Sequence, residues 1–271
     1  MPRTCRVPSY LVALLAANAI ATAALAEPDA AELAKELANP VSSLISVPLQ
    51  VNVDDNIGAL DEGSRVAFVV QPVIPFSLNE DWNLISRTIV PLIRQDDIFP
   101  GSGSQSGFGD TIQSLFLSPV KPSTSGWIWG AGPVLLLPTS TDRLIGTGKW
   151  GAGPTAVALK QQGPWTYGIL TNHIWSFAGD GKRSDVNSTF MQPFVGYTTA
   201  GAWSFDLQTE TTYDWESEQW NVPLVLLVSK VTSIGDQLIQ VQAGPRYFAR
   251  HFDGGPEGLG FRVAVTLLFP R

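Results

Sequence analysis

Polar and apolar residues alternate with a period of two over most of the chain after residue 42. In the segment 203–213 the odd positions are mainly aromatic or aliphatic, and the even positions are polar. Alternate residues of a β-strand face opposite sides, so this pattern predicts a strand with one apolar and one polar face. Trp203 and Tyr213 stand at the two ends of the apolar row. Lipid-facing strands carry aromatic residues in this way where they meet the two membrane interfaces.

Segments of this kind recur along the chain and predict about twelve strands, although ten or fourteen also fit the pattern. We expect the strands at residues 43–53, 65–77, 82–94, 109–119, 127–137, 149–160, 165–177, 187–198, 202–214, 221–231, 237–249 and 259–269. Connections after the even-numbered strands are short, and those after the odd-numbered strands are longer and polar. This asymmetry is typical of outer-membrane barrels, which have short periplasmic turns and long outer loops.

The pattern therefore predicts an all-β protein, an antiparallel up-and-down transmembrane β-barrel over residues 43–271. A secreted soluble β-sandwich or β-propeller is the alternative, because soluble sheets also alternate. The chain shows no blade repeat of about 40 residues, which a propeller would have. Gly-rich pieces in the loops, at 101–104 and 146–148, read as flexible loop tips.

Two segments precede the barrel. Residues 1–26 have a basic start, an apolar middle and the small-x-small end Ala24-Leu25-Ala26, the pattern of a secretory signal peptide. An uncleaved N-terminal membrane helix is the alternative. Residues 27–42 begin with a helix-like stretch, which Asn39-Pro40 ends because the residue before a proline disfavours helical geometry. We expect a short helical periplasmic lead-in there.

Composition agrees with export to a membrane. Charged residues make up 15% of the chain, against about 25% in typical soluble proteins. Yet after the signal no apolar run approaches the roughly 18 residues that a membrane helix needs. Strands that place every second residue on lipid reconcile these observations. The net charge of −7 argues against a nucleic-acid partner, and the single cysteine, Cys5, lies in the predicted signal. No disulfide or thiolate metal site is expected in the exported chain.

The run Asn39-Pro40-Val41-Ser42-Ser43-Leu44-Ile45-Ser46-Val47-Pro48-Leu49-Gln50 resembles the opening strand of a family of bacterial outer-membrane proteins named for the meta-pathway of phenol degradation. Further matching pieces are Phe108-Gly109-Asp110, Asn172-His173-Ile174-Trp175-Ser176, Ala178-Gly179-Asp180 and Gln192-Pro193-Phe194. The resemblance spans most of residues 39–270. It implies a barrel and, more loosely, transport of small aromatic or hydrophobic compounds. It brings no catalytic or ligand motif.

The polar face of the predicted barrel supplies the candidate site. Charged side chains turned toward lipid cost a few kcal/mol near the midplane, so we expect them to point inward. We expect the lumen to be lined by Asp206, Gln208, Glu210, Gln240, Gln242, Arg246 and Arg262, with Arg65 and Arg87 as further candidates. Such a row either lines a narrow aqueous path that selects solutes, or pairs across the lumen and plugs it.

No set of residues predicts catalysis, a metal or a cofactor. His173 and Ser176 lie three apart on one predicted strand and face opposite sides, so they cannot form a nucleophile–base pair. Two histidines leave little for a zinc site. Acidic residues in two outer loops either are solvated or hold divalent cations between lipopolysaccharide phosphates. These residues are Asp180, Asp185, Asp214, Glu216 and Glu218.

The sequence therefore predicts an outer-membrane barrel that acts as a passive channel or transporter for small molecules. The expected partners are outer-membrane lipid, lipopolysaccharide and a small-molecule solute, with no nucleic acid and no cofactor. Two other hypotheses are a lipid-acting outer-membrane enzyme and a structural or adhesive barrel with a plugged lumen. The solute, the openness of the lumen and the oligomeric state stay open at this point.

Overall fold

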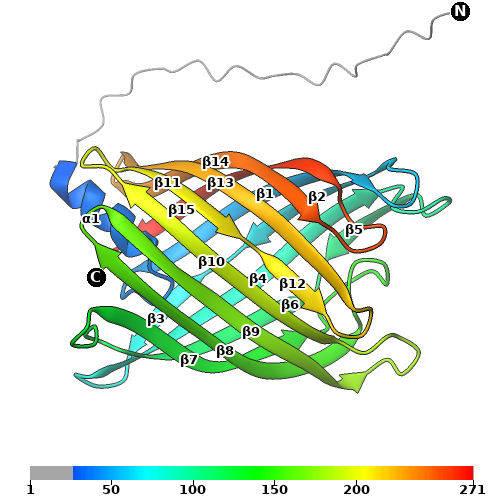
Figure 1. Cartoon of the computed structure of the whole chain (residues 1–271), viewed down its shortest axis with the longest axis horizontal. Coiled ribbons are helices and arrows are strands. Elements are labelled where there is room, and N and C mark those ends of the chain that lie inside the picture. The colour runs from blue at the N-terminus through cyan, green and yellow to red at the C-terminus, as the bar shows by residue number, and fades with distance from the viewer. Residues whose placement is uncertain (1–26, 271) are drawn as a thin grey trace, which may run out of the picture.

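The chain folds into a closed antiparallel β-barrel with one short helix. The computed structural model describes residues 27–270, and the predicted signal peptide lies outside the described residues. Each strand pairs with its neighbours in sequence, and β1 (Ile45–Ile57) pairs with β15 (Gly258–Phe269), which closes the sheet (Figure 1). This is the up-and-down architecture that the alternation predicts.

Within residues 27–270, fifteen β segments make twelve barrel strands, because three strands are interrupted once. The interrupted strands are β2 (Gly63–Val70) with β3 (Val73–Ser77), β5 (Ser104–Phe108) with β6 (Thr111–Pro119), and β11 (Trp203–Thr209) with β12 (Thr211–Asp214). The others are β1, β4 (Trp82–Asp96), β7 (Trp127–Leu137), β8 (Lys149–Gln162), β9 (Trp165–Gly179), β10 (Asn187–Thr198), β13 (Gln219–Ile234), β14 (Gln237–Arg250) and β15. The predicted strand count is confirmed.

The interruption between β2 and β3 follows from the sequence. Pro72 has no backbone N–H, so it cannot donate to the neighbouring strand. Its carbonyl still accepts a hydrogen bond from the Thr88 N–H at 3.1 Å. On the other side, the Gln71 N–H donates to the Pro48 carbonyl at 2.9 Å. The register of β2 and β3 on β4 is the same, so the strand continues through the break.

The outer wall of the barrel is apolar along its middle and aromatic at its two ends. Leu207 and Leu226 are 50% and 51% exposed, although they lie well inside their strands. Aromatic rings meet edge to face near the end that carries the helix, as Trp165 and Tyr197 do. Tyr213 and Trp220 form a second group at the opposite end. An apolar band between two aromatic girdles is the surface of a barrel that spans a lipid bilayer.

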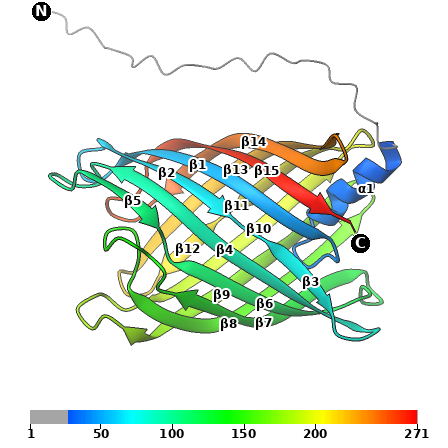
Figure 2. The same ribbon diagram turned by 180° about the vertical axis from the view of Figure 1, so that it is seen from behind.

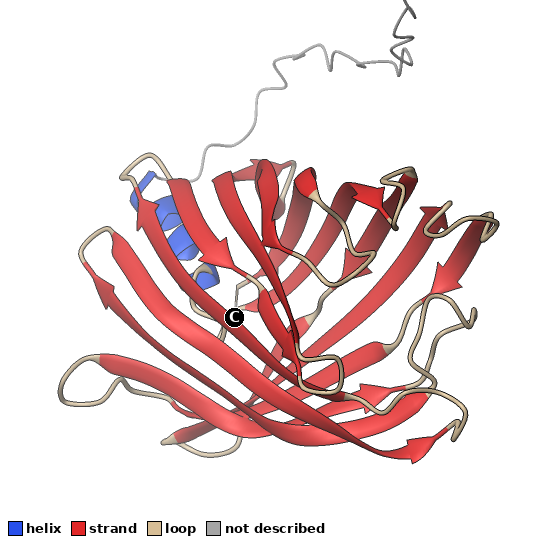
Figure 3. Cartoon of the chain, turned by 45° about the vertical axis from the view of Figure 1, so that its right-hand side comes forward, coloured by secondary structure: helices blue, strands red, loops and turns tan. Residues whose placement is uncertain are grey.

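The lead-in forms a helix, α1 (Glu27–Leu37), at the barrel end where the C-terminus also lies (Figures 1 and 2). Figure 3 shows this helix, in blue, at the rim of the barrel. Ala30 and Ala34 pack against Val231 and Leu268 of the wall and against Leu44, which immediately precedes β1. In residues 27–270 no helix has the length and apolar character needed to cross a membrane.

After α1 the chain turns into the barrel before it starts β1. Val41 is 5% exposed and packs in a buried cluster with inward side chains of the wall. These side chains are Ile85, Phe116, Val157, Leu159 and Leu170. A side chain at position 130 would meet Val41, so Gly130 leaves room for this approach. The lead-in therefore occupies the inside of the barrel mouth.

If the outer wall meets lipid, a charge placed in its middle must destabilise the barrel. We expect Leu207→Arg to lower the free energy of unfolding by about 2–4 kcal/mol, the cost of an arginine near the bilayer midplane. Urea unfolding in phospholipid vesicles, followed by tryptophan fluorescence, measures this. The matched control is Leu60→Arg, because Leu60 is 61% exposed in the connection between β1 and β2. Equal losses for the two variants would contradict the membrane face.

Candidate functional site

The seven residues expected to line the lumen all carry side chains on the inner side of the wall. Six of them border one cavity of about 240 Å³: Asp206, Gln208, Glu210, Gln240, Gln242 and Arg262. Arg246 lies next to this cavity and contacts Glu210. Of the two further candidates, Arg87 borders the cavity, and Arg65 instead donates to Gln95 Oε1 at 3.1 Å.

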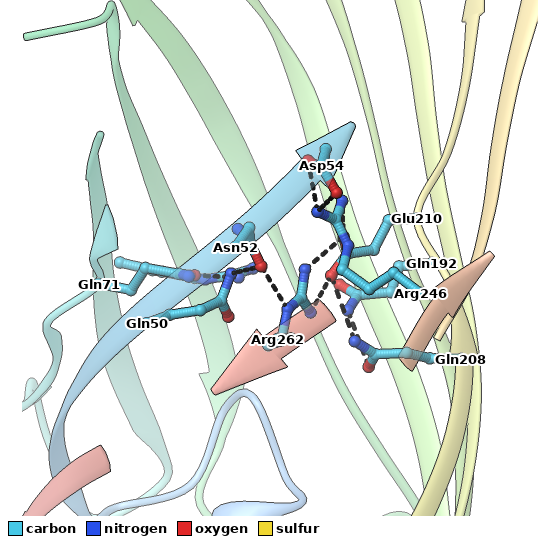
Figure 4. A network of polar contacts seen from close by, with 10 residues as sticks. Gln50, Asn52, Asp54, Gln71, Gln192, Gln208, Glu210, Arg246 and Arg262 are labelled. Carbon is cyan, nitrogen blue, oxygen red and sulfur yellow. Dashed lines mark hydrogen bonds and ion pairs between the residues drawn. The ribbon is translucent and has the colours of Figure 1, made fainter. Parts of the chain in front are cut away.

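Two arginines and two carboxylates form the centre of the site (Figure 4). Arg246 Nη1 contacts Asp54 Oδ1 at 2.7 Å and Oδ2 at 2.8 Å. Arg262 holds Glu210 with two hydrogen bonds, Nη1 to Oε1 at 2.6 Å and Nη2 to Oε2 at 2.8 Å. Arg246 Nη2 also lies 3.7 Å from Glu210 Oε2, so Glu210 faces both arginines. Two parallel N–H···O bonds are the strongest geometry for an arginine–carboxylate pair.

The closure of the barrel brings these residues together. Arg262 on β15 lies opposite Asn52 on β1, and its Nε donates to Asn52 Oδ1 at 2.8 Å. Arg246 lies opposite Gly260 in the β14–β15 pair. A side chain at position 260 would meet the Asp54 carboxylate, so the glycine leaves the space that this carboxylate occupies. We call Asn52, Asp54, Glu210, Arg246 and Arg262 the seam network.

Amide side chains extend the seam network along the inner wall. Gln208 donates to Glu210 Oε1 at 3.2 Å and accepts from Gln192 at 3.1 Å. Gln50 donates to Asn52 Oδ1 at 3.2 Å. Arg87 donates to Gln71 Oε1 at 3.0 Å. Each of these amide side chains has a partner, as buried polar groups need, whereas Arg246 Nε of the seam network is buried without one among the described residues.

Sequence reasoning missed several members of this site: Gln50, Asn52, Asp54, Gln71 and Gln192. The predicted end of the first strand at residue 53 is too early, because β1 continues to Ile57 and includes Asp54. The signal was present, since the polar positions of β1 are spaced by two and reach Asp54. Because Asp54 is charged and is followed by Asp55, the strand was predicted to end before it.

The cavity is lined by apolar as well as polar side chains. Its apolar lining consists of Leu37, Val73, Leu170, Phe194 and Leu227. Residues 38–40 and Ser42 of the lead-in also border it. A further hollow of about 370 Å³ lies on the other side of the lead-in, and the two hollows share Asn39 and Ser42 as lining residues. The segment 39–42 therefore separates the cavity from the mouth.

At the opposite end, the loop between β7 and β8 is held by hydrogen bonds. The Asp110 carboxylate accepts from the Thr147 N–H and hydroxyl, both at 2.6 Å, and from the Ser140 N–H at 3.2 Å. Gln95, which is 1% exposed, donates to the Leu144 carbonyl at 3.1 Å. Arg183 of the next loop donates to the Gly146 carbonyl. The tip at 146–148, expected to be flexible, is thus fixed in place.

The acidic outer loops show local partners. Asp185 accepts from Lys149 Nζ at 2.8 Å and from the Ser176 hydroxyl at 3.1 Å, and the hydrogen bond from Lys149 lowers the pKa of this carboxyl. Asp214 accepts from the Glu216 N–H at 2.8 Å. Among residues 27–270, no three His, Cys, Asp or Glu side chains lie close enough together to hold a metal ion.

His173 and Ser176 lie on opposite faces of β9, as their spacing predicts. The Ser176 hydroxyl is on the inner side with Asp185, whereas the His173 ring is on the outer side, 4.0 Å from the Trp175 ring. His173 Nδ1 lies 2.7 Å from Thr189 Oγ1, which also accepts from Trp215 Nε1 at 2.9 Å. This cross-strand contact between β9 and β10 needs the register, which sequence alone does not supply.

Removal of one charge from the seam network must leave a buried partner unmatched. We expect Asp54→Asn to lower the free energy of unfolding by roughly 3–5 kcal/mol, the cost of breaking a buried ion pair from one side. Asp55→Asn is the matched control, because it removes the same charge from an exposed neighbour on β1. Urea unfolding in vesicles measures both. The double variant Asp54→Asn/Arg246→Gln should recover part of the loss, and strictly additive losses would contradict the pairing.

Comparisons with known proteins show likeness at the level of the fold. An outer-membrane channel from Pseudomonas putida F1 superposes with a TM-score of 0.66 at 16% identity, over 83% of this chain and 94% of that chain. The β-domain of the Bordetella autotransporter BrkA gives 0.48 at 11% identity, over 84% and 100%. The outer membrane phospholipase A of Escherichia coli gives 0.46 at 12% identity, over 83% and 96%. No family model and no curated protein matches the chain. The fold is that of an outer-membrane β-barrel.

Proposed function

We propose that the chain is an outer-membrane channel for small, partly apolar molecules, which its own lead-in closes from the periplasmic side. The observation that carries the proposal is the cavity of about 240 Å³ between the seam network and the lead-in. A cavity inside the barrel that is lined by both polar and apolar side chains suits a solute with both characters.

The interior consists of hollows in succession. A vestibule of about 670 Å³ lies at the outer mouth and is lined by residues such as Arg143, Arg183 and Phe252. The central cavity follows, and then the hollow of about 370 Å³ beside the lead-in. Two partitions separate them, the seam network and the segment 39–42. Small movements of these two partitions would connect the hollows, which is why we favour a gated channel.

The distribution of charge supports a channel over a structural or adhesive barrel with a plugged lumen. In the part of the barrel interior that the structure describes, the ion pairs between strands of the seam gather at one level, around Glu210. The cavity below it is lined mainly by amides, hydroxyls and apolar side chains, and its charged residues Arg87 and Asp206 form no ion pair with another described residue. A barrel plugged by design would pair charges at every level.

The family resemblance is a second line of support. The run 39–50, which resembles the opening strand of the family named for the meta-pathway of phenol degradation, includes the segment that borders the cavity. An apolar lining with Leu170 and Phe194 suits an aromatic ring. On this proposal the exported chain lies in the outer membrane, with lipid around its wall and lipopolysaccharide around its outer loops.

A reversible cross-link tests the gate. Gly130 Cβ, if present, would lie 3.1 Å from Val41 Cγ1, so Val41→Cys/Gly130→Cys places two thiols within disulfide reach. We expect the oxidised variant to pass no small solute in liposome-swelling assays and the reduced variant to pass it, because only the reduced lead-in can leave the lumen. The exported chain has no other cysteine, and the single variants control for each substitution.

The outcome that contradicts the gate is equal flux in the oxidised and reduced states.

The channel itself is tested by Ala34→Glu, which puts a charge where α1 packs at 1% exposure and should release the helix. If neither this variant nor the wild type conducts ions or passes solutes at any pH, the proposed function fails. Glu32→Gln, at an exposed position of α1, is the control.

A lipid-acting enzyme is the second candidate, because His173 and Thr189 form an imidazole–hydroxyl contact on the lipid-facing side. Against it, His173 Nε2 is buried without a hydrogen-bond partner among the described residues, so no carboxylate orients the ring. The Trp215 N–H also occupies the Thr189 hydroxyl. We expect no phospholipid hydrolysis by the purified barrel. An activity lost in both His173→Ala and Thr189→Ala would overturn this expectation.

A further inference from the structure

Two charges that border the central cavity have no ion-pair partner within the described part of the chain. Arg262 and Glu210 satisfy each other, and Arg246 is matched by Asp54. Arg87 donates to the neutral amide of Gln71, and the carboxylate that acts on it electrostatically, Glu210, is already held by Arg262. The remaining four cavity-lining or adjoining charges of the seam network therefore cancel, and Arg87 and Asp206 are left to face the cavity.

The surroundings of Asp206 explain why its carboxylate is unmatched. Its direct cross-strand neighbours are Gly196 on β10 and Leu227 on β13, and neither carries a polar side chain. Gln208, two residues along the same strand, is engaged with Gln192 and Glu210. A side chain at position 196 would meet the Asp206 carboxylate, so this glycine keeps the space beside the carboxylate free.

Arg87 and Asp206 lie on opposite sides of the barrel. In the closed sheet, β4 is followed by β2 with β3, β1, β15, β14 and β13 before β11 is reached. In a twelve-stranded barrel this is half of the circumference. Both side chains border the same cavity, so an unmatched positive group and an unmatched negative group face it from opposing walls.

The space between the two charges is apolar in part. Phe194 lies on β10, which pairs with β11, Leu170 lies on β9 beyond it, and Leu37 of the lead-in also contributes. A ring can pack against these side chains, and the face of Phe194 favours a nearby cation. An unmatched charge in a partly dehydrated space binds an opposite charge more strongly than it would in water.

We propose that the cavity binds small bipolar molecules, with an ammonium group toward Asp206, a carboxylate toward Arg87, and an aromatic or aliphatic body between them. This inference rests on the proposed function, because it names the solute class of that channel. It adds two charged groups to the small aromatic or hydrophobic compounds that the family resemblance implies. A solute with one charge would match only one of the two walls.

The experiment uses four probes that share one ring: 4-(aminomethyl)benzoate, benzylamine, benzoate and benzyl alcohol. Binding to the full exported chain in neutral detergent is measured by isothermal titration calorimetry. We expect the bipolar probe to bind about tenfold or more tightly than either singly charged probe, since it gains one further charge-assisted contact. Benzyl alcohol should bind most weakly. Equal affinity for the four probes, or no binding of any, would overturn the proposal.

Two variants assign the two ends of the solute. With Asp206→Asn, the affinity for the bipolar probe should fall to that of benzoate, and benzoate itself should bind unchanged. With Arg87→Gln, the affinity for the bipolar probe should fall to that of benzylamine. Matched controls are Asp236→Asn in the turn after β13, and Arg94→Gln, whose side chain is 71% exposed on the same strand as Arg87. If the controls act like the cavity variants, the assignment is wrong.

A milder variant guards against misfolding. Gly196→Ala keeps all charges but displaces the Asp206 carboxylate, so it should reduce affinity for benzylamine and leave affinity for benzoate unchanged. Flux of the same probes through liposomes separates the two proposals. The expected binding pattern without flux, even after release of the lead-in, would contradict the channel and keep the binding site. Flux without preference among the probes would contradict the binding site and keep the channel.

Discussion

The pairing of β1 with β15 is the constraint on which the rest of the structure depends. A sheet surrounded by lipid cannot leave an edge unpaired, because no water is present to satisfy its backbone groups. The closing ladder runs from Ile45 opposite Phe269 to Val53 opposite Phe261. It brings Asn52 to Arg262 and Asp54 to Arg246, which are separated by 210 and 192 residues in the sequence.

The seam network therefore does two things with the same contacts. Its two arginines, on β14 and β15, contact Asp54 and Asn52 on β1 and Glu210 between β11 and β12. These contacts reinforce the closure from inside the barrel. Glu210 and Arg262 of the same network also border the central cavity, so on the proposed function they form part of the partition between the outer and the central hollow. Stability of the seam and the width of the path are consequently coupled, and a change that widens the path by removal of an arginine must also weaken the closure.

Much of the fold and part of the site could be predicted from the sequence. Alternation with a period of two is imposed by the wall itself, so the strands and the inward side of Asp206, Gln208 and Glu210 follow from it. Contacts that depend on register could not be predicted in this way. The Arg246–Asp54 pair and the His173–Thr189 contact both join different strands, and periodicity within a strand says nothing about its neighbour.

The position of the lead-in could not be predicted from the sequence, for a different physical reason. Its helix was expected, but a helix with alanine and leucine on one side can pack on many surfaces. What decides its place is the shape of the barrel mouth, above all the space that Gly130 leaves for Val41. That space exists only once β7 is in the closed sheet, so no local pattern of residues 27–42 contains it.

Strand number explains why the chain needs such a segment. Eight-stranded barrels are filled by their own side chains, and sixteen-stranded barrels leave an open aqueous channel. Twelve strands lie between these limits, so wall side chains alone fill part of the interior. The lead-in takes up the remaining space on the apolar side, where Val41 meets Phe116 and Leu159. The central cavity is the part of the interior that the lead-in does not fill.

On the proposed function, the two ends of the lumen are closed in different ways, and this difference favours the periplasmic end as the moving part. The outer loop is held by short charge-assisted hydrogen bonds to Asp110, whose position is fixed by the wall. The lead-in is held by apolar contacts of Ala30, Ala34 and Val41 with the wall and by a hydrogen bond from Gln161 Nε2 to the Lys35 carbonyl at 2.7 Å. At about 25 cal/mol per Å² of buried apolar surface, the alanine contacts of α1 contribute modestly. A closure of this kind can open while the barrel stays folded.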